Sequence, residues 1–212
     1  MKIKFVSVIV ILLLSVMMDA NAQDKRLKKE LDKEYKKKLK EYKSENWKIT
    51  GTSRTLEVKL LQHYELLKDE DNKEMEAYVS KCISINVCQQ TAINNALTKY
   101  ASLAGTYLRG RVTSELSNDQ SSEQIPEFDR MYAAYERLVA KEIKGELQES
   151  YSLVRDKGSS KEYRTFFIVN EKKASNARIR AMEQAFSESQ LARENATKIS
   201  SFIQEGFELN KN

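Results

Sequence analysis

Residues 147–169, LQESYSLVRDKGSSKEYRTFFIV, form the stretch that decides the fold. Two runs suited to strands, Leu147–Arg155 and Tyr163–Val169, flank the turn-forming residues 156–160, and this order predicts a β-hairpin. Apolar side chains occupy both alternating faces of the second run, so we expect that strand to be central and covered on both sides. Alternation in the first run places three apolar residues on one face, namely Leu147, Tyr151 and Leu153.

Two helices are expected before the hairpin. The first spans about residues 89–109 and carries a stripe of small residues that would let it approach a sheet closely, with Gly105 and Gly110 marking its end. A polar segment, 117–124, follows. Pro126 suits the first position of the second helix, and Gly145 stands where a left-handed cap is expected. The core face predicted for this second helix consists of Phe128, Met131, Tyr132, Tyr135, Leu138, Val139 and Ile143.

After the hairpin, Asn170 can cap a helix that runs to about Leu191, and a last helix carries Ile199, Phe202, Ile203 and Phe207. Towards the N-terminus we expect a short strand at 47–52, a helix at 55–68 and an extended segment at 75–87. The face predicted to be buried on the helix at 55–68 comprises Leu56, Leu60, His63, Tyr64 and Leu67. The fold class is therefore α+β. It is a small sheet with a hairpin in the C-terminal half, packed by several helices within a single domain at 47–212 that ends in helices.

The order of an alanine-rich helix at Thr91–Ala104, a polar loop, a second helix and the hairpin resembles two envelope-protein families. These are the twenty-kilodalton surface-lipoprotein family and the N-terminal domain of the flagellar protein FlgT, and the resemblance covers residues 89–170. The whole chain also resembles exported proteins of Bacteroidota. The resemblance implies a structural or binding role in the envelope rather than catalysis. It does not extend to a lipid anchor, because no cysteine stands at the expected cleavage site.

Residues 1–22 have the three regions of a secretory signal peptide. Lys2 and Lys4 precede an apolar run at 5–18, and Ala20-Asn21-Ala22 supplies small residues for cleavage. The run is shorter than the roughly 20 residues needed to cross a bilayer. We expect cleavage after Ala22 and a soluble protein that is periplasmic or secreted, without a membrane span. The alternative is an uncleaved N-terminal membrane anchor.

Residues 23–46 predict a charged amphipathic helix. Between Asp24 and Glu45 the chain has ten basic and six acidic residues, a surplus equal to that of the whole chain after residue 22. The apolar stripe of this helix, Leu27, Leu31, Tyr35, Leu39 and Tyr42, is narrow, so we expect the helix to be peripheral to the fold. We expect it to be central to interactions through Lys28, Lys29, Lys33, Lys36, Lys37 and Lys40. A solvated helix that merely docks its stripe is the alternative.

Cys82 and Cys88 are the only cysteines, and export would place them where a disulfide persists. We therefore predict a Cys82–Cys88 disulfide, which needs a bend at 84–86. The alternative is one straight strand, which would hold the two cysteines about 20 Å apart, beyond the roughly 7 Å that a disulfide allows. His63 could activate one of the thiols, but its neighbours predict a packed helix face.

No other pattern predicts a catalytic, metal-binding or cofactor-binding site. One histidine and a C-x5-C pair do not give the spacing of a zinc site. The pattern Gly105-x4-Gly110 ends a helix rather than opening one, which argues against a phosphate-binding loop. Export argues against nucleic acid as the partner of this basic chain.

Three functions remain. The first is a non-enzymatic exported envelope protein that acts as a structural, accessory or binding module, with an envelope protein as partner. The second is a binder of an anionic envelope polymer or lipid head groups through the lysine-rich helix. The third is a hydrolase whose catalytic residues the sequence does not reveal.

Overall fold

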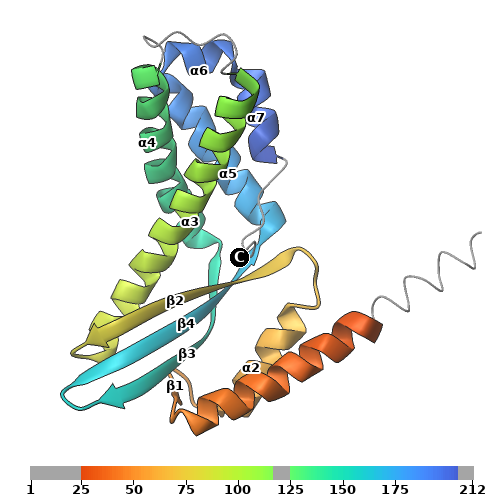
Figure 1. The fold of residues 1–212 in the computed structure, drawn as a ribbon, viewed down its shortest axis with the longest axis vertical. Coiled ribbons are helices and arrows are strands. Elements are labelled where there is room, and N and C mark those ends of the chain that lie inside the picture. The colour runs from red at the N-terminus through yellow and green to blue at the C-terminus, as the bar shows by residue number, and fades with distance from the viewer. Residues whose placement is uncertain (1–24, 117–124, 205–212) are drawn as a thin grey trace, which may run out of the picture.

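Residues 25–116 and 125–204 are described in a computed structural model of the chain (Figure 1). The strands β1 (Lys48–Thr50), β2 (Asn72–Cys82), β3 (Leu147–Lys157) and β4 (Ser160–Asn170) form one antiparallel sheet in the order β1-β3-β4-β2. Helices cover both faces of this sheet, which confirms the α+β class. The predicted hairpin is β3-β4, and β4 lies in the interior of the sheet as expected.

The hairpin closes with fewer loop residues than the sequence indicates. Lys157 pairs with Ser160, so Gly158 and Ser159 alone make the turn, and Gly158 has a positive φ of 63° that such a turn requires. A bulge between Glu149 and Tyr151 adds one residue to β3.

This bulge corrects the expectation that Leu147, Tyr151 and Leu153 share one face. An extra residue turns the side chains that follow it to the other side of the sheet. Leu147 therefore packs on the face covered by the C-terminal helices, whereas Tyr151 and Leu153 lie on the opposite face.

The first face of the sheet is covered by α3 (Ile85–Leu116). α4 (Ile125–Glu142) packs on α3 and α5 (Glu171–Ala185) packs on α4, in a helical bundle that rises from the sheet, with α6 (Gln190–Glu194) and α7 (Ala196–Gln204) at its far end (Figure 1). The α3 alanines, Ala92, Ala96, Ala101 and Ala104, are buried, and small side chains let this helix lie close to its neighbours. Asn170 caps α5 as predicted, because its side chain accepts a hydrogen bond from the amide of Lys173 at 3.3 Å. The helix faces predicted for α4 and α7 supply core residues Phe128, Met131, Tyr132, Tyr135, Val139, Ile143, Ile199, Phe202 and Ile203.

Helix ends differ from the sequence expectation in three places. Helix α3 continues through Gly105 and Gly110, and beyond them Val112 is buried in the core, so packing outweighs the weak helix propensity of glycine. Gly145 ends a 3₁₀ turn, Ile143–Gly145, and does not adopt the left-handed conformation expected of it. Helix α5 ends at Ala185 rather than near Leu191. The predicted polar loop at 117–124 and Phe207 lie outside the described residues.

The second face of the sheet is covered by the N-terminal helix, residues 25–44, and by α2 (Leu56–Leu66) (Figure 1). Thr55 caps α2, and Leu56, Leu60, His63 and Tyr64 are buried as predicted. The second core consists of Tyr42, Trp47, Leu56, Leu60, Tyr64, Tyr151, Leu153 and Phe166, with Leu31, Tyr35 and Leu39 partly buried against it.

The expectation that the N-terminal helix is peripheral is therefore wrong. Tyr42 has 0 % of its surface exposed, and its ring lies 6.2 Å from that of Phe166 in the central strand. The aromatic side chains that β3 and β4 direct to this face need an apolar cover, and the stripe of the N-terminal helix supplies part of it.

Candidate functional site: a lysine face on the N-terminal helix

The N-terminal helix is fixed to the sheet at its C-terminal end. Asn46 adopts a left-handed φ of 60°, and the amide of Trp47 donates to the carbonyl of Tyr42 at 2.9 Å. Together with the bond from the Asn46 amide to the Lys43 carbonyl, at 3.3 Å, this is a Schellman cap. The cap turns the chain so that Trp47 and Tyr42 enter the same core.

Polar contacts add to this attachment. The Tyr42 and Tyr151 hydroxyl oxygens lie 3.4 Å apart, and Lys43 forms an ion pair with Glu57 of α2 at 2.5 Å. The Lys43 ammonium holds the pKa of the Glu57 carboxyl at about 2, well below its ordinary value, through this hydrogen-bonded pair. The helix is thus held by both the sheet and α2.

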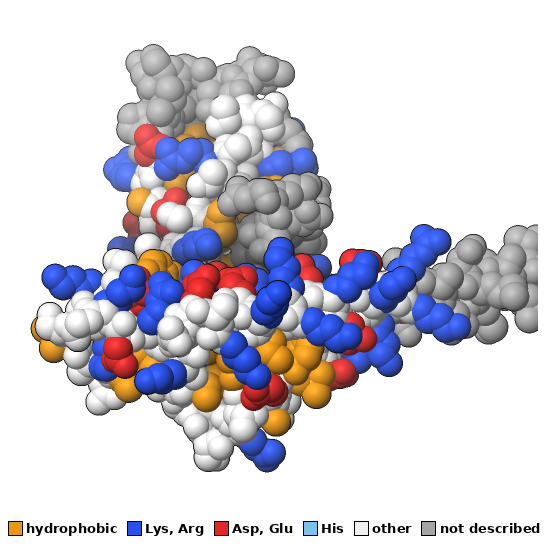
Figure 2. All heavy atoms as spheres, turned by 60° about the horizontal axis from the view of Figure 1, so that its bottom comes forward, with side chains coloured by type: hydrophobic (Ala, Val, Ile, Leu, Met, Phe, Trp, Pro, Cys, Tyr) orange, Lys and Arg blue, Asp and Glu red, His pale blue; other side chains and the backbone are white. Residues whose placement is uncertain are grey.

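The six lysines predicted to form an interaction surface are all exposed, and we call them the lysine face: Lys28, Lys29, Lys33, Lys36, Lys37 and Lys40. Lys29, Lys33, Lys36 and Lys40 recur at spacings of four, three and four, which puts them on the side of the helix opposite the docked stripe. From Lys28 to Lys40 the face extends about 18 Å at the helical rise of 1.5 Å per residue. Figure 2 shows basic side chains along this helix as it leaves the body of the molecule.

Few of these charges are neutralised within the molecule. Lys33 pairs with Glu30 at 2.7 Å, and none of the other five forms an ion pair with a residue in the described part of the chain. Lys38, on the flank of the helix, pairs with Glu41 at 3.1 Å, so the Glu41 carboxylate is already neutralised by a lysine outside the lysine face. An exposed row of unpaired ammonium groups attracts anions over a distance set by the salt concentration.

A groove of about 850 Å³ lies beside the N-terminal end of this helix. Its lining includes Arg26, Leu27 and Glu30 of the helix and residues 67–73, which form the turn between α2 and β2 and the first two residues of β2. The acidic side chains of that turn are partly paired, since Asp71 forms an ion pair with Lys172 at 2.5 Å. Among the described residues no three His, Cys, Asp or Glu side chains are grouped to hold a metal ion.

His63 is a core residue, as its sequence neighbours indicate. It is fully buried, its Nδ1 lies 3.0 Å from the Ser150 hydroxyl, and its Nε2 lies 2.5 Å from a carboxylate oxygen of Glu74. Sequence reasoning missed this row of Ser150, His63 and Glu74, because the three residues come from β3, α2 and β2 and carry no local motif. The Ser150 hydroxyl is nearly buried in the β3 bulge, so in this structure the row links three elements rather than presenting a nucleophile.

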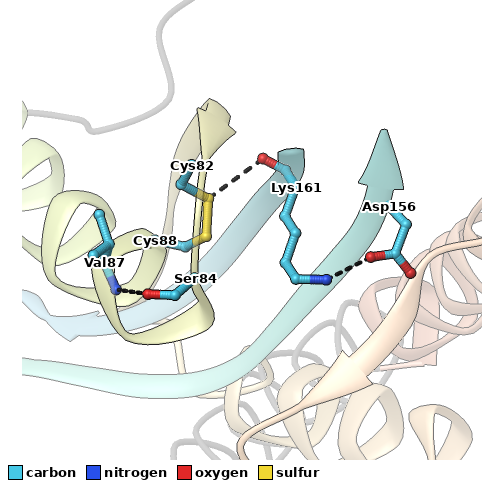
Figure 3. Close-up of a disulfide and its surroundings, with 6 residues drawn as sticks. All are labelled: Cys82, Ser84, Val87, Cys88, Asp156 and Lys161. Atoms are coloured by element: carbon cyan, nitrogen blue, oxygen red, sulfur yellow. Dashed lines mark hydrogen bonds and ion pairs between the residues drawn. A yellow bond between two sulfur atoms is a disulfide. The ribbon is translucent and has the colours of Figure 1, made fainter. Parts of the chain in front are cut away.

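The predicted Cys82–Cys88 disulfide is present, with the two Cα atoms 5.4 Å apart (Figure 3). The bend that allows it comes slightly earlier than expected: β2 ends at Cys82, and α3 begins at Ile85, so the extended segment does not reach Val87. Both sulfur atoms are part of the disulfide, so His63 has no thiol to activate.

The chain matches no protein-family model, no curated protein and no solved structure. In the described ranges, none of the helices is both long enough and apolar enough to cross a membrane.

Proposed function

We propose that this protein is an exported, non-enzymatic binding module of the cell envelope, and that it contacts an anionic envelope component through the lysine face. One observation carries the choice of partner. The N-terminal helix packs its apolar stripe against the sheet. Its exposed lysines, most of which form no ion pair with described residues, face solvent. A partner that approaches this side of the helix meets positive charge and little apolar surface, which favours an anion over an apolar protein groove.

The sequence resemblance to envelope proteins and the signal-like residues 1–22 support the cellular location. Export accords with a disulfide, because disulfides persist in oxidising compartments. Intact mass of the protein from the envelope fraction tests this part of the proposal. A chain that begins at Gln23 is expected, and a chain that retains residues 1–22 would contradict it.

The lysine face is tested with a soluble polyanion, dextran sulfate. The variant Lys29→Gln, Lys33→Gln, Lys36→Gln, Lys40→Gln should bind at least about 10-fold more weakly than wild type at about 50 mM NaCl. Wild-type binding should weaken strongly at about 500 mM NaCl, because exposed charges are then screened.

A matched control removes the same charge from four exposed lysines on other elements: Lys141, Lys144, Lys173 and Lys198, each changed to Gln. This control variant should keep most of the binding. Equal losses in the two variants would mean that only net charge matters and would overturn the assignment of the lysine face.

A further inference from the structure

The disulfide closes a short loop that displays apolar side chains to solvent. Ile83 is 86 % exposed, Val87 52 % and Ile85 39 %, so three of the large hydrophobic residues exposed in the described chain fall within five positions. The other such residues are Tyr78 in β2 and three residues of α2, Val58, Leu61 and Leu66. Ile83 protrudes further than any of them.

Local structure holds the loop in one position on the body of the protein. Cys82 and Cys88 are both buried in the core on the α3 side of the sheet, which holds the two ends of the loop against the body of the protein. Ser84 caps the start of α3. Its carbonyl accepts from the Cys88 amide at 2.9 Å. Its hydroxyl accepts from the Val87 amide at 3.4 Å (Figure 3). Relative to the inward-facing Cys88, Val87 lies about 100° round the helix and is 52 % exposed, whereas Ile85, three positions earlier, lies nearer the buried side and is 39 % exposed.

No packing within the described chain requires apolar residues at these three exposed positions. A polar residue at position 83 would satisfy the same turn, and exposure of an isoleucine to water gains nothing for folding. The disulfide also holds the loop in one conformation, which lowers the entropy cost of binding. Apolar side chains that are exposed together and held in place are a feature of interaction sites.

The chain segment that contains the loop carries only basic charge, and the nearby acidic residues, Asp156 and Glu149, belong to β3. From Ala77 to Ser114 the chain contains no acidic residue, and its charged side chains there are Lys81, Lys99, Arg109 and Arg111. Lys81 is exposed beside Ile83, and Lys161 lies across the sheet from Cys82, where it pairs with Asp156 at 2.5 Å. The exposed Ile83 with the basic Lys81 near it in the sequence matches a surface that offers both an apolar phase and negative charge.

We infer that the loop between Cys82 and Cys88 inserts Ile83, with Ile85 and Val87, into the interface of an anionic lipid surface. The inference rests on the proposed function and names a lipid surface as the anionic component. A soluble anionic polymer could satisfy the lysine face, but it offers no apolar phase for Ile83. Peripheral membrane binding strengthens with buried apolar area and with attraction of basic residues to anionic lipid, and the loop and the lysine face supply one contribution each.

Co-sedimentation with vesicles tests the inference, using a chain that begins at Gln23 and so keeps every described residue. Vesicles of phosphatidylcholine with about 30 % phosphatidylglycerol should bind the wild-type protein, and phosphatidylcholine alone should bind it much more weakly. Ile83→Ser should lower binding to the anionic vesicles about 10-fold, because one large apolar side chain then no longer leaves water. Binding of Ile83→Ser to dextran sulfate should equal that of wild type.

Leu61→Ser is the matched control, because Leu61 is 49 % exposed on α2, outside the loop. It should leave vesicle binding unchanged, and an effect equal to that of Ile83→Ser would overturn the role of the loop. Ile83→Trp gives a direct readout: its added fluorescence should shift to shorter wavelength with anionic vesicles and be quenched by brominated lipid. Absence of both changes in a vesicle-bound protein would also overturn insertion.

The two proposals fail in different ways. Normal binding to dextran sulfate together with vesicle binding that Ile83→Ser does not change would leave the lysine face standing and remove the lipid inference. Failure to bind either dextran sulfate or anionic vesicles would overturn both.

Discussion

Tyr42→Ala should weaken the packing of the N-terminal helix on the sheet and so destabilise the whole protein. The side chain of Tyr42 is fully buried, its ring centre lies 6.5 Å from that of Tyr151 and 6.2 Å from that of Phe166, and its hydroxyl meets the Tyr151 hydroxyl at 3.4 Å. Truncation of a buried aromatic residue to alanine costs about 4 kcal/mol of unfolding free energy. For a chain of this size that loss lowers Tm by about 8–16 °C.

Two further variants isolate the cause of this loss. Tyr42→Phe keeps the ring and removes only the hydroxyl, so it should cost about 1 kcal/mol and lower Tm by a few degrees. Lys36→Ala, on the exposed side of the same helix, should change stability by less than about 0.5 kcal/mol. Thermal melts followed by circular dichroism compare the three variants with the wild-type protein.

A melt of Tyr42→Ala within about 3 °C of wild type would refute the reasoning. It would mean that the N-terminal helix does not cover the sheet in solution, and that the earlier expectation of a peripheral helix is correct.

Two other features give measurable expectations. Burial raises the pKa of Tyr42, Tyr100 and Tyr132 to about 12 each, whereas an unfolded tyrosine ionises near pH 10. Their contribution to stability is thus complete below about pH 10 and decreases by about 1 kcal/mol per group per pH unit above it. Circular dichroism and tyrosinate absorbance should change together between about pH 10 and 12, and ionisation of these groups without unfolding would contradict the prediction. At the hairpin, Gly158→Ala should lower the free energy of unfolding in urea by about 1 kcal/mol, because alanine tolerates the positive φ poorly. Gly145→Ala, at a position with ordinary φ, should leave the free energy of unfolding unchanged or raise it slightly. Equal losses in the two variants would count against the turn geometry.

Most local elements of the fold could be predicted from the sequence, because their signals are local. Alternating apolar residues on both faces identified β4 as a buried strand, and the Asp-Lys-Gly-Ser-Ser segment identified the hairpin turn. Asn170 marked the start of α5, since a capping side chain needs only the amide three residues later. The six lysines of the lysine face were named as an interaction surface from the surplus charge of the helix, and the structure leaves all six exposed.

Contacts between distant elements were decided by the tertiary structure. The bulge in β3 moves Tyr151 to the second face of the sheet, and no local pattern at Ser150 indicates it. Helix α3 continues past Gly105 and Gly110 because packing against other helices outweighs the propensity of two residues. His63, Ser150 and Glu74 form one row only because α2 lies across the sheet.

The sequence by itself determined where the N-terminal helix carries its charge and where it carries its apolar stripe, since both follow from a period of 3.6 residues. It could not determine how much that stripe is buried, because burial depends on which surface it meets. The tertiary structure provides that surface in Tyr151, Leu153 and Phe166, which β3 and β4 direct to the same side of the sheet. A stripe that is narrow in sequence is therefore part of a core, because strands about 100 residues later in the chain complete it.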